Sequence, residues 1–168
     1  MSDRIAIMHD GILDQLGTPT EIYEQPKTKF VATFIGETNI FDGSIAEMDG
    51  NKALIAVENG SIAGCGEGFR EGEYISVSVR PEKMKFSDTP VKDFSIHAVV
   101  KDYIYVGSVI KCIVRLSNGN ELKIERLAGE ELPEPGALIY PYWNPEDAVL
   151  IHTQSGKIFE AIENITFS

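Results

Sequence analysis

Histidine has the widest choice of chemistry in this 168-residue sequence, because imidazole can ligate a metal or accept a proton from a nucleophile. The three histidines, His9, His97 and His152, are widely separated along the chain. They show no H-x-x-x-H spacing and no pairing with a cysteine, so neither a zinc site nor an activated thiol is indicated. The dispersed carboxylates define no acid–base pair. The sequence therefore predicts no independent active site.

Phosphate binding is the next chemistry to consider. No segment matches G-x-x-x-x-G-K-[ST], the loop whose backbone N–H groups and lysine hold a triphosphate. The glycine-rich segment 64–68 lacks a lysine and carries Glu67, so we interpret it as part of a loop. We expect this chain to hold no cofactor and no metal, and neither to bind nor to hydrolyse ATP.

The charge balance disfavours whole classes of partner. Fifteen lysines and arginines stand against 26 acidic residues, a net charge of −11, which disfavours nucleic acids and anionic membranes. The same balance is compatible with polycations, although solvated surface acid is its commoner cause. The sequence has no signal peptide and no apolar run of about 20 residues that would span a bilayer. The two cysteines lack a CxxC spacing, which is typical of a reduced cytoplasmic setting.

The first 36 residues predict a hairpin followed by two short helices. Residues 4–16 form the hairpin, with Asp10-Gly11 as its turn. Thr18 and Glu21 have the spacing of a capping box at the start of a helix that Pro26 limits to about two turns. Four apolar residues at helical spacing predict the second helix, which ends at Gly36: Phe30, Val31, Phe34 and Ile35. A hairpin and two short helices cannot bury their own apolar faces, so they must pack on another element.

The rest of the chain predicts many short strands, separated by turn residues. The predicted strands are residues 40–46, 54–57, 74–80, 94–101, 110–116, 121–127, 137–142 and 149–151. Residues 64–72 are predicted to form a loop, and Val106-Gly107-Ser108 a break or bulge in a strand. Cys112 lies on the apolar face of its strand, so we expect it to be buried, and Ser155-Gly156 predicts a final hairpin turn. This pattern favours a closed or sandwich-like β architecture.

Two long segments resemble one known family. SDRIAIMHDGILDQLGTPTEIYEQP and FVATFIGETNIF are similar, in order and spacing, to the segment that follows the nucleotide-binding core in ATP-binding subunits of ABC importers. The letters GETNIF are more similar to the branch for spermidine/putrescine uptake than to the maltose branch. Arg80-Pro81-Glu82, at the end of a predicted strand, is a second mark of this family. From the residues alone it is a structural motif in which Arg80 and Glu82 could pair across the break made by Pro81.

The resemblance implies a mainly β fold with an OB-fold-like (TOBE) barrel or sandwich. It implies that residues 1–17 are the terminal hairpin of a truncated nucleotide-binding domain, with Met1 as an engineered start, and that residues 18–38 are a helical linker. Residues 39–168 are then the C-terminal TOBE/OB-type regulatory domain. In the parent protein ATP and Mg²⁺ would bind upstream. LSNGN at 116–120 departs from the ABC signature LSGGQ and predicts a hairpin turn instead.

Three functions remain open. The first is a regulatory and dimerisation domain at the cytoplasmic face of the membrane, with a second ATP-binding subunit and the importer's membrane subunits as partners. The second is a sensor of polyamine or oxyanion, with effector contacts chosen by composition alone: Tyr103, Tyr105, Glu130 and Glu131. The third is an OB-fold nucleic-acid binder, which the acidic balance places last. An ATP-binding subunit of a sugar or iron importer is the alternative parent.

Overall fold

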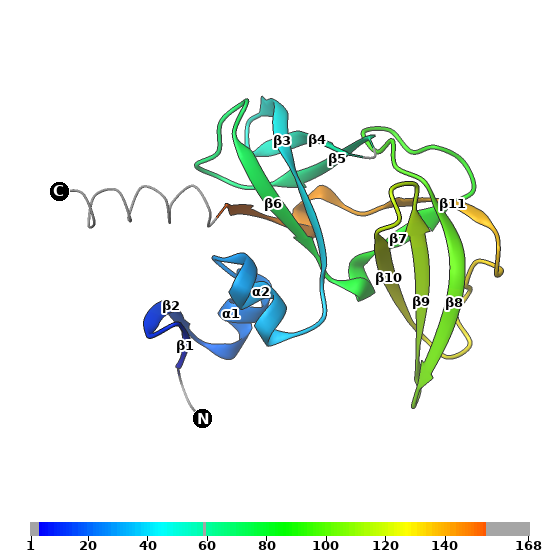
Figure 1. The fold of residues 1–168 in the computed structure, drawn as a ribbon, viewed down its shortest axis with the longest axis horizontal. Coiled ribbons are helices and arrows are strands. Elements are labelled where there is room, and N and C mark those ends of the chain that lie inside the picture. Colours follow the sequence, from blue (N-terminus) through cyan, green and yellow to red (C-terminus); the bar gives the residue numbers. More distant parts are fainter. Residues whose placement is uncertain (1–3, 59, 154–168) are drawn as a thin grey trace.

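The computed structural model describes residues 4–58 and 60–153, which form a hairpin, two short helices and two β-sheets (Figure 1). The two sheets enclose one continuous hydrophobic core, whereas the hairpin and helices share a small one of their own. The mainly β architecture predicted from the sequence is confirmed. The predicted hairpin turn at Ser155-Gly156 lies outside the described residues.

The hairpin and both helices form where the local sequence predicts them. Strands β1 (Ile5–His9) and β2 (Ile12–Gly17) pair around a turn in which Asp10 and Gly11 have positive φ. Helix α1 (Pro19–Glu24) has the predicted capping box between Thr18 and Glu21. Helix α2 (Lys29–Ile35) begins at Thr28, whose hydroxyl accepts the Val31 amide. The side chains of Ile7, Ile22 and Val31 join hairpin and helices in the small core.

The first sheet closes into a five-stranded barrel in the order β12-β5-β4-β3-β6. Its strands are β3 (Asn39–Asp49), β4 (Lys52–Val57), β5 (Gly60–Cys65), β6 (Tyr74–Val79) and β12 (Ala148–His152). The sequence pattern missed β5, because its glycines and serine hide the alternation of a strand. A Cβ at Gly64 would lie 2.9 Å from Cδ2 of Leu150, so a larger residue there would require that side chain to shift.

The second sheet has the order β10-β9-β8-β11-β7. Its strands are β7 (Lys85–Ser87), β8 (Ala98–Val106), β9 (Val109–Leu116), β10 (Glu121–Leu127) and β11 (Leu138–Tyr142). The predicted strand 94–101 begins only at Ala98, because the preceding segment instead hydrogen-bonds to the barrel through Ser95 and Ser61. Gly107, with φ of 64°, lies in the β8–β9 hairpin turn, and the irregularity in register lies between Val100 and Asp102. The strand break predicted at 106–108 is therefore confirmed as a hairpin turn, whereas a bulge at this position was wrong.

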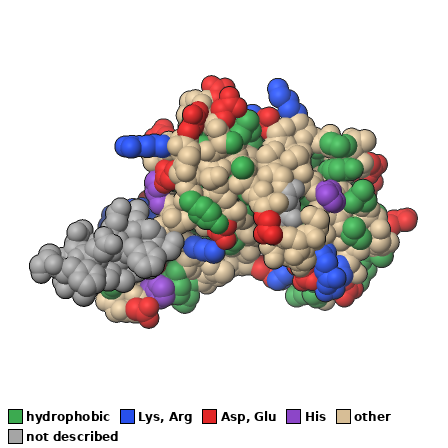
Figure 2. Space-filling view, turned by 45° about the horizontal axis from the view of Figure 1, so that its top comes forward, with side chains coloured by type: hydrophobic (Ala, Val, Ile, Leu, Met, Phe, Trp, Pro, Cys, Tyr) green, Lys and Arg blue, Asp and Glu red, His purple; other side chains and the backbone are tan. Residues whose placement is uncertain are grey.

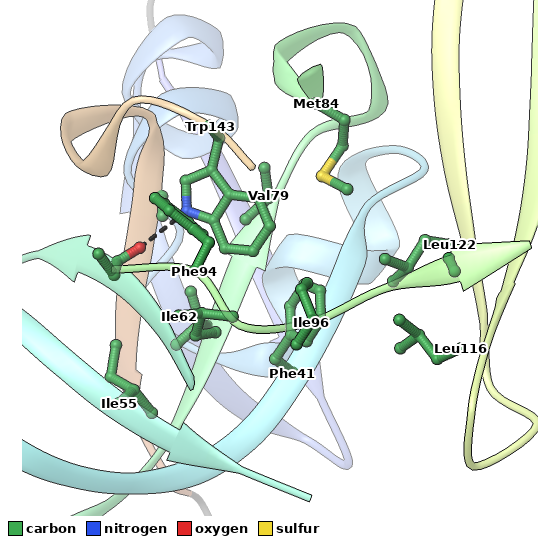
Figure 3. Packing of buried hydrophobic residues seen from close by; sticks show 14 of the residues in the cluster. Phe41, Ile55, Ile62, Val79, Met84, Phe94, Ile96, Leu116, Leu122 and Trp143 are labelled. Atoms are coloured by element: carbon green, nitrogen blue, oxygen red, sulfur yellow. Dashed lines mark hydrogen bonds between the residues drawn. The ribbon is translucent and has the colours of Figure 1, made fainter. Parts of the chain in front are cut away.

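Trp143 lies at the centre of the shared core, as Figure 3 shows. It is 1% exposed, packs against Phe41 and Phe94, and donates its indole N–H to the carbonyl of Ala63 at 2.8 Å. Residues from the second sheet complete the same cluster, among them Cys112, which is buried as predicted. Burial raises the pKa of its thiol to about 11. One core thus fixes the two sheets relative to each other.

The outer edge of β10 is occupied by side chains of the same chain. The Asn39 amide group exchanges two hydrogen bonds with the backbone of Lys123, at 2.8 and 2.9 Å. Arg126 donates to the carbonyl of Glu125, and the Glu130 carboxylate accepts the Leu127 amide at 2.7 Å. These contacts replace a neighbouring strand along much of this edge.

We predict that Trp143→Ala lowers the free energy of unfolding by about 4 kcal/mol, because it empties a large buried site and leaves the Ala63 carbonyl unpaired. Urea denaturation followed by far-UV circular dichroism measures the change. Leu138→Ala is the control: its side chain is 51% exposed, so a change within about 0.5 kcal/mol is expected. Equal losses in the two variants would contradict the central place of Trp143.

Candidate functional site

The most densely connected polar site lies where the helix pair meets both sheets, and we call it the junction. It consists of Tyr23 of α1, residues 36–39 after α2, Ser78 and Arg80 at the end of β6, Glu82, and Lys111 and Lys123 of the second sheet. Its members come from five separate parts of the sequence. Of the predicted site residues, Arg80, Pro81 and Glu82 belong to it or adjoin it.

Arg80 holds the ends of both helices. Its guanidinium donates to the carbonyl of Tyr23 at 3.3 Å and to that of Ala32 at 3.0 Å. Both carbonyls lie in the last turn of a helix, where they have no partner within the helix. It also donates to the carbonyls of Gly36 and Glu37, at 3.0 and 3.1 Å. Only arginine offers five N–H donors in a rigid planar group, and here the arginine residue is 7% exposed.

Tyr23 connects Arg80 to Glu82. The Arg80 guanidinium carbon lies 4.4 Å from the centre of the Tyr23 ring, a cation–π contact. The Tyr23 hydroxyl donates to the Glu82 carboxylate at 2.6 Å. Burial and this hydrogen bond raise the pKa of Tyr23 to about 12, and burial lowers the pKa of Arg80. The direct Arg80–Glu82 pair expected from the sequence is not among the ion pairs of the described residues; the tyrosine stands between them.

Pro81 has the structural role that its position predicts. It ends the strand pairing of β6 and opens a single turn of 3-10 helix, Pro81–Lys83, in which Pro81 is buried and the other two residues are exposed. This turn packs beside β10 and brings Glu82 under Tyr23. The three-residue motif therefore turns the chain while it fixes α1.

The residues after α2 bind to both sheets. The Thr38 hydroxyl is hydrogen-bonded to the Ser78 hydroxyl of the barrel at 2.6 Å, while Asn39 pairs with the backbone of Lys123 in the second sheet. The Glu37 carboxylate forms ion pairs with Lys111 at 2.9 Å and Lys123 at 2.8 Å. Hydrogen bonds from Lys123 and Lys111 lower the pKa of Glu37.

The residues proposed for an effector do not meet in one place. Tyr103 and Tyr105 lie on β8, Tyr103 partly buried and Tyr105 72% exposed. Glu130 accepts a backbone amide and lines a shallow hollow in which neither tyrosine takes part, and Glu131 is an exposed loop residue. In residues 4–58 and 60–153, no group of three histidine, cysteine or acidic side chains is placed to hold a metal ion.

A larger groove lies between the barrel and the second sheet. It encloses about 660 Å³ and is lined by Asp42, Glu58, Tyr74 and Glu121, among others. Its carboxylates already have partners: Lys29 binds Asp42, Asn118 binds Glu58, and Lys101 and Arg115 bind Glu121. Elsewhere, acidic and basic side chains are interspersed on the face drawn in Figure 2, without a continuous basic area.

Comparison with known proteins identifies the second sheet and the part of the barrel formed by the end of β6 and by β12. A family model described as TOBE domain matches residues 77–151, which run from β6 through β12. The chain contains a TOBE domain. The junction lies at the start of this TOBE domain, because Ser78, Arg80 and Glu82 all fall within the first residues matched.

The resemblance extends beyond the TOBE domain. The spermidine/putrescine import ATP-binding protein PotA of Roseobacter denitrificans is 40% identical over 147 residues, 83% of this chain and 40% of that protein. The protein of the same name from Acidothermus cellulolyticus is 35% identical over 95% of this chain and 44% of that protein. The chain is thus homologous to these ATP-binding proteins and spans about two fifths of their length.

A solved structure supports the fold. The cytoplasmic molybdate-binding protein ModG, crystallised with molybdate bound, aligns with 67% of this chain and 94% of that chain. The TM-score is 0.56 at 14% sequence identity, so the likeness concerns the fold alone. It confirms the OB-fold-like architecture expected for a TOBE domain.

We predict that Arg80→Lys lowers the free energy of unfolding by about 2 to 3 kcal/mol, because lysine lacks the second nitrogen that binds the Tyr23 carbonyl and the planar group that stacks on the Tyr23 ring. Guanidinium chloride denaturation measures the loss, and hydrogen exchange should show α1 and α2 losing protection first. Arg70→Lys, at an exposed position, is the control and should change stability by less than about 0.5 kcal/mol. Unchanged protection of both helices would refute the role assigned to Arg80.

We predict that Tyr23 ionises with a midpoint near pH 12, seen as the tyrosinate absorbance lost in a Tyr23→Phe variant. Its folded pKa is raised from 10, so its contribution to stability is complete below pH 10 and disappears as the pH rises through 12. Glu82→Gln should lower the midpoint, because the neutral amide no longer opposes the phenolate charge. A midpoint near pH 10 in the folded chain would contradict both the burial of Tyr23 and its hydrogen bond to Glu82.

Proposed function

We propose that this chain is the C-terminal regulatory and dimerisation domain of the ATP-binding subunit of an ABC importer for spermidine or putrescine. The names of its homologues support this subunit and this substrate class over a sugar or iron importer. The junction is the observation that carries the proposal: it fastens the TOBE domain to the helices and hairpin that precede it. Because of these contacts, a movement of the helices and hairpin would also move the TOBE domain.

An exposed apolar surface on the hairpin and α2 supports attachment to the rest of such a subunit. Its members are Met8, Ile12, Leu13, Leu16 and Phe34, each at least half exposed, with Ile12 67% and Phe34 64% exposed. Isolated exposed apolar residues are common, but a group of this size on a two-stranded hairpin indicates a contact surface. The partner in this proposal is the ATP-binding core, for which the homologue leaves room, since this chain covers 40% of its length.

Work is divided between the two parts of the subunit. The core binds ATP and Mg²⁺ and hydrolyses the nucleotide, while this chain, which lacks a phosphate-binding loop, neither binds nor hydrolyses it. The chain holds a second copy of the subunit nearby and sets how readily the two cores close, beside the membrane subunits at the cytoplasmic face. No helix in residues 4–58 and 60–153 has the length and apolar character needed to cross a bilayer.

Polyamine sensing is the second candidate, and the groove between the sheets favours it. Three carboxylates and the exposed Tyr74 ring line this groove, which suits an extended cation better than an oxyanion. The ion pairs of Asp42 and Glu121 oppose it, because a bound polyamine would have to displace Lys29, Lys101 and Arg115.

Native mass spectrometry of the purified chain, with and without spermidine, tests both candidates. We expect a dimer at low micromolar concentration with no spermidine adduct. A monomer that retains one spermidine, and loses it in an Asp42→Asn/Glu58→Gln variant, would replace the dimerisation role with sensing. A monomer with no adduct would refute both roles for the isolated chain. Tight Mg²⁺-dependent binding of ATP would refute the division of work.

A further inference from the structure

We propose that Glu37, Thr38 and Asn39 form a rigid coupler between the helix pair and the second sheet, in which Glu37 is a positioning residue. The inference rests on the proposed function, because it describes how a movement on the helix side would reach the far end of the TOBE domain. It concerns the orientation of the second sheet, whereas the proposed function concerns assembly.

The three residues of the coupler follow the helix pair directly and contact both the barrel and the second sheet. Its backbone is held by Arg80 of the barrel through the carbonyl of Glu37 at 3.1 Å. The Thr38 hydroxyl is hydrogen-bonded to Ser78 of the barrel at 2.6 Å. The side chains of Glu37 and Asn39 reach the second sheet. Because α2 ends directly before Gly36, little free chain remains between the helix and these contacts.

The contacts to the second sheet restrict rotation as well as separation. Asn39 is 5% exposed and exchanges two hydrogen bonds with the backbone of Lys123, as a residue of a paired strand would. Glu37 binds one lysine on β9 and another on β10, so its carboxylate spans two neighbouring strands. Two attachments on different strands leave the sheet one orientation relative to the helices.

The second sheet carries this orientation to an exposed end. Figure 1 shows the turn of the β8–β9 hairpin at the bottom of the view, whereas the β3–β4 turn of the barrel lies at the top. The hairpin end exposes Tyr105 and Val106, 72% and 52% respectively. A rotation of the helix pair therefore displaces this end without being absorbed at the junction. The shared core also joins the second sheet to the barrel, so Glu37 and Asn39 add a direct connection from the residues after α2 to β9 and β10.

Pulsed electron–electron spin resonance on the whole chain tests the coupler. Spin labels are placed at Glu24→Cys in α1 and Ser108→Cys in the β8–β9 turn, in a Cys65→Ser/Cys112→Ala background. We expect one narrow distance distribution. It should broaden by at least half in Glu37→Gln and at least double in width in Glu37→Gln/Asn39→Ala.

Glu121→Gln is the matched control. The Glu121 carboxylate also binds two basic side chains, Lys101 and Arg115, but all three lie within the second sheet. The control should keep the narrow distribution. A width unchanged in the double variant, or equal broadening in the control, would overturn the coupler. If the double variant does not fold, Glu37→Gln decides alone. The labelled chain is diluted with an excess of unlabelled chain, so that distances between copies do not contribute. The coupler can then fail while the proposed function stands.

Discussion

The buried Arg80 guanidinium is the interaction on which the arrangement of the parts depends. Two helices of six and seven residues are too short to be stable alone, and each ends in carbonyls that need donors. A single cation at the end of β6 meets this need for both helices and stacks on Tyr23. The position of the helices on the barrel therefore depends on Arg80, which lies 48 residues after Ala32 in the sequence.

Local rules predicted the elements whose signals are local. The capping box at Thr18, the turn at Asp10-Gly11 and the strand 121–127 follow from neighbouring residues, and the structure confirms them. Strand β5 and the late start of β8 were missed because partners distant in sequence decide them: Gly64 fits under Leu150, and Ser95 binds Ser61. The junction was predicted only in part. Arg80 and Glu82 were found by motif, whereas Tyr23, Lys111 and Lys123 carry no local signal of their role.

The contacts of the junction explain the residues of the GETNIF segment, which is residues 36–41. Gly36 and Glu37 present carbonyls to Arg80, Glu37 binds two lysines, Thr38 binds Ser78, and Asn39 pairs with β10. Each of the first four letters thus contributes a contact between bodies, and Phe41, the last letter, enters the core beside Trp143. A short motif that looks like a linker in sequence is the most constrained part of the domain.

The occupied edge of β10 has a consequence for how copies of this domain behave when crowded. An open strand edge invites another chain to extend the sheet, and such pairing can continue without limit. Here Asn39, Arg126 and Glu130 take up backbone groups along that edge. Extension of the second sheet by another chain is thereby hindered at β10, one of the two edges of this sheet. When many copies are crowded together, this edge is therefore less available for aggregation than an open strand would be.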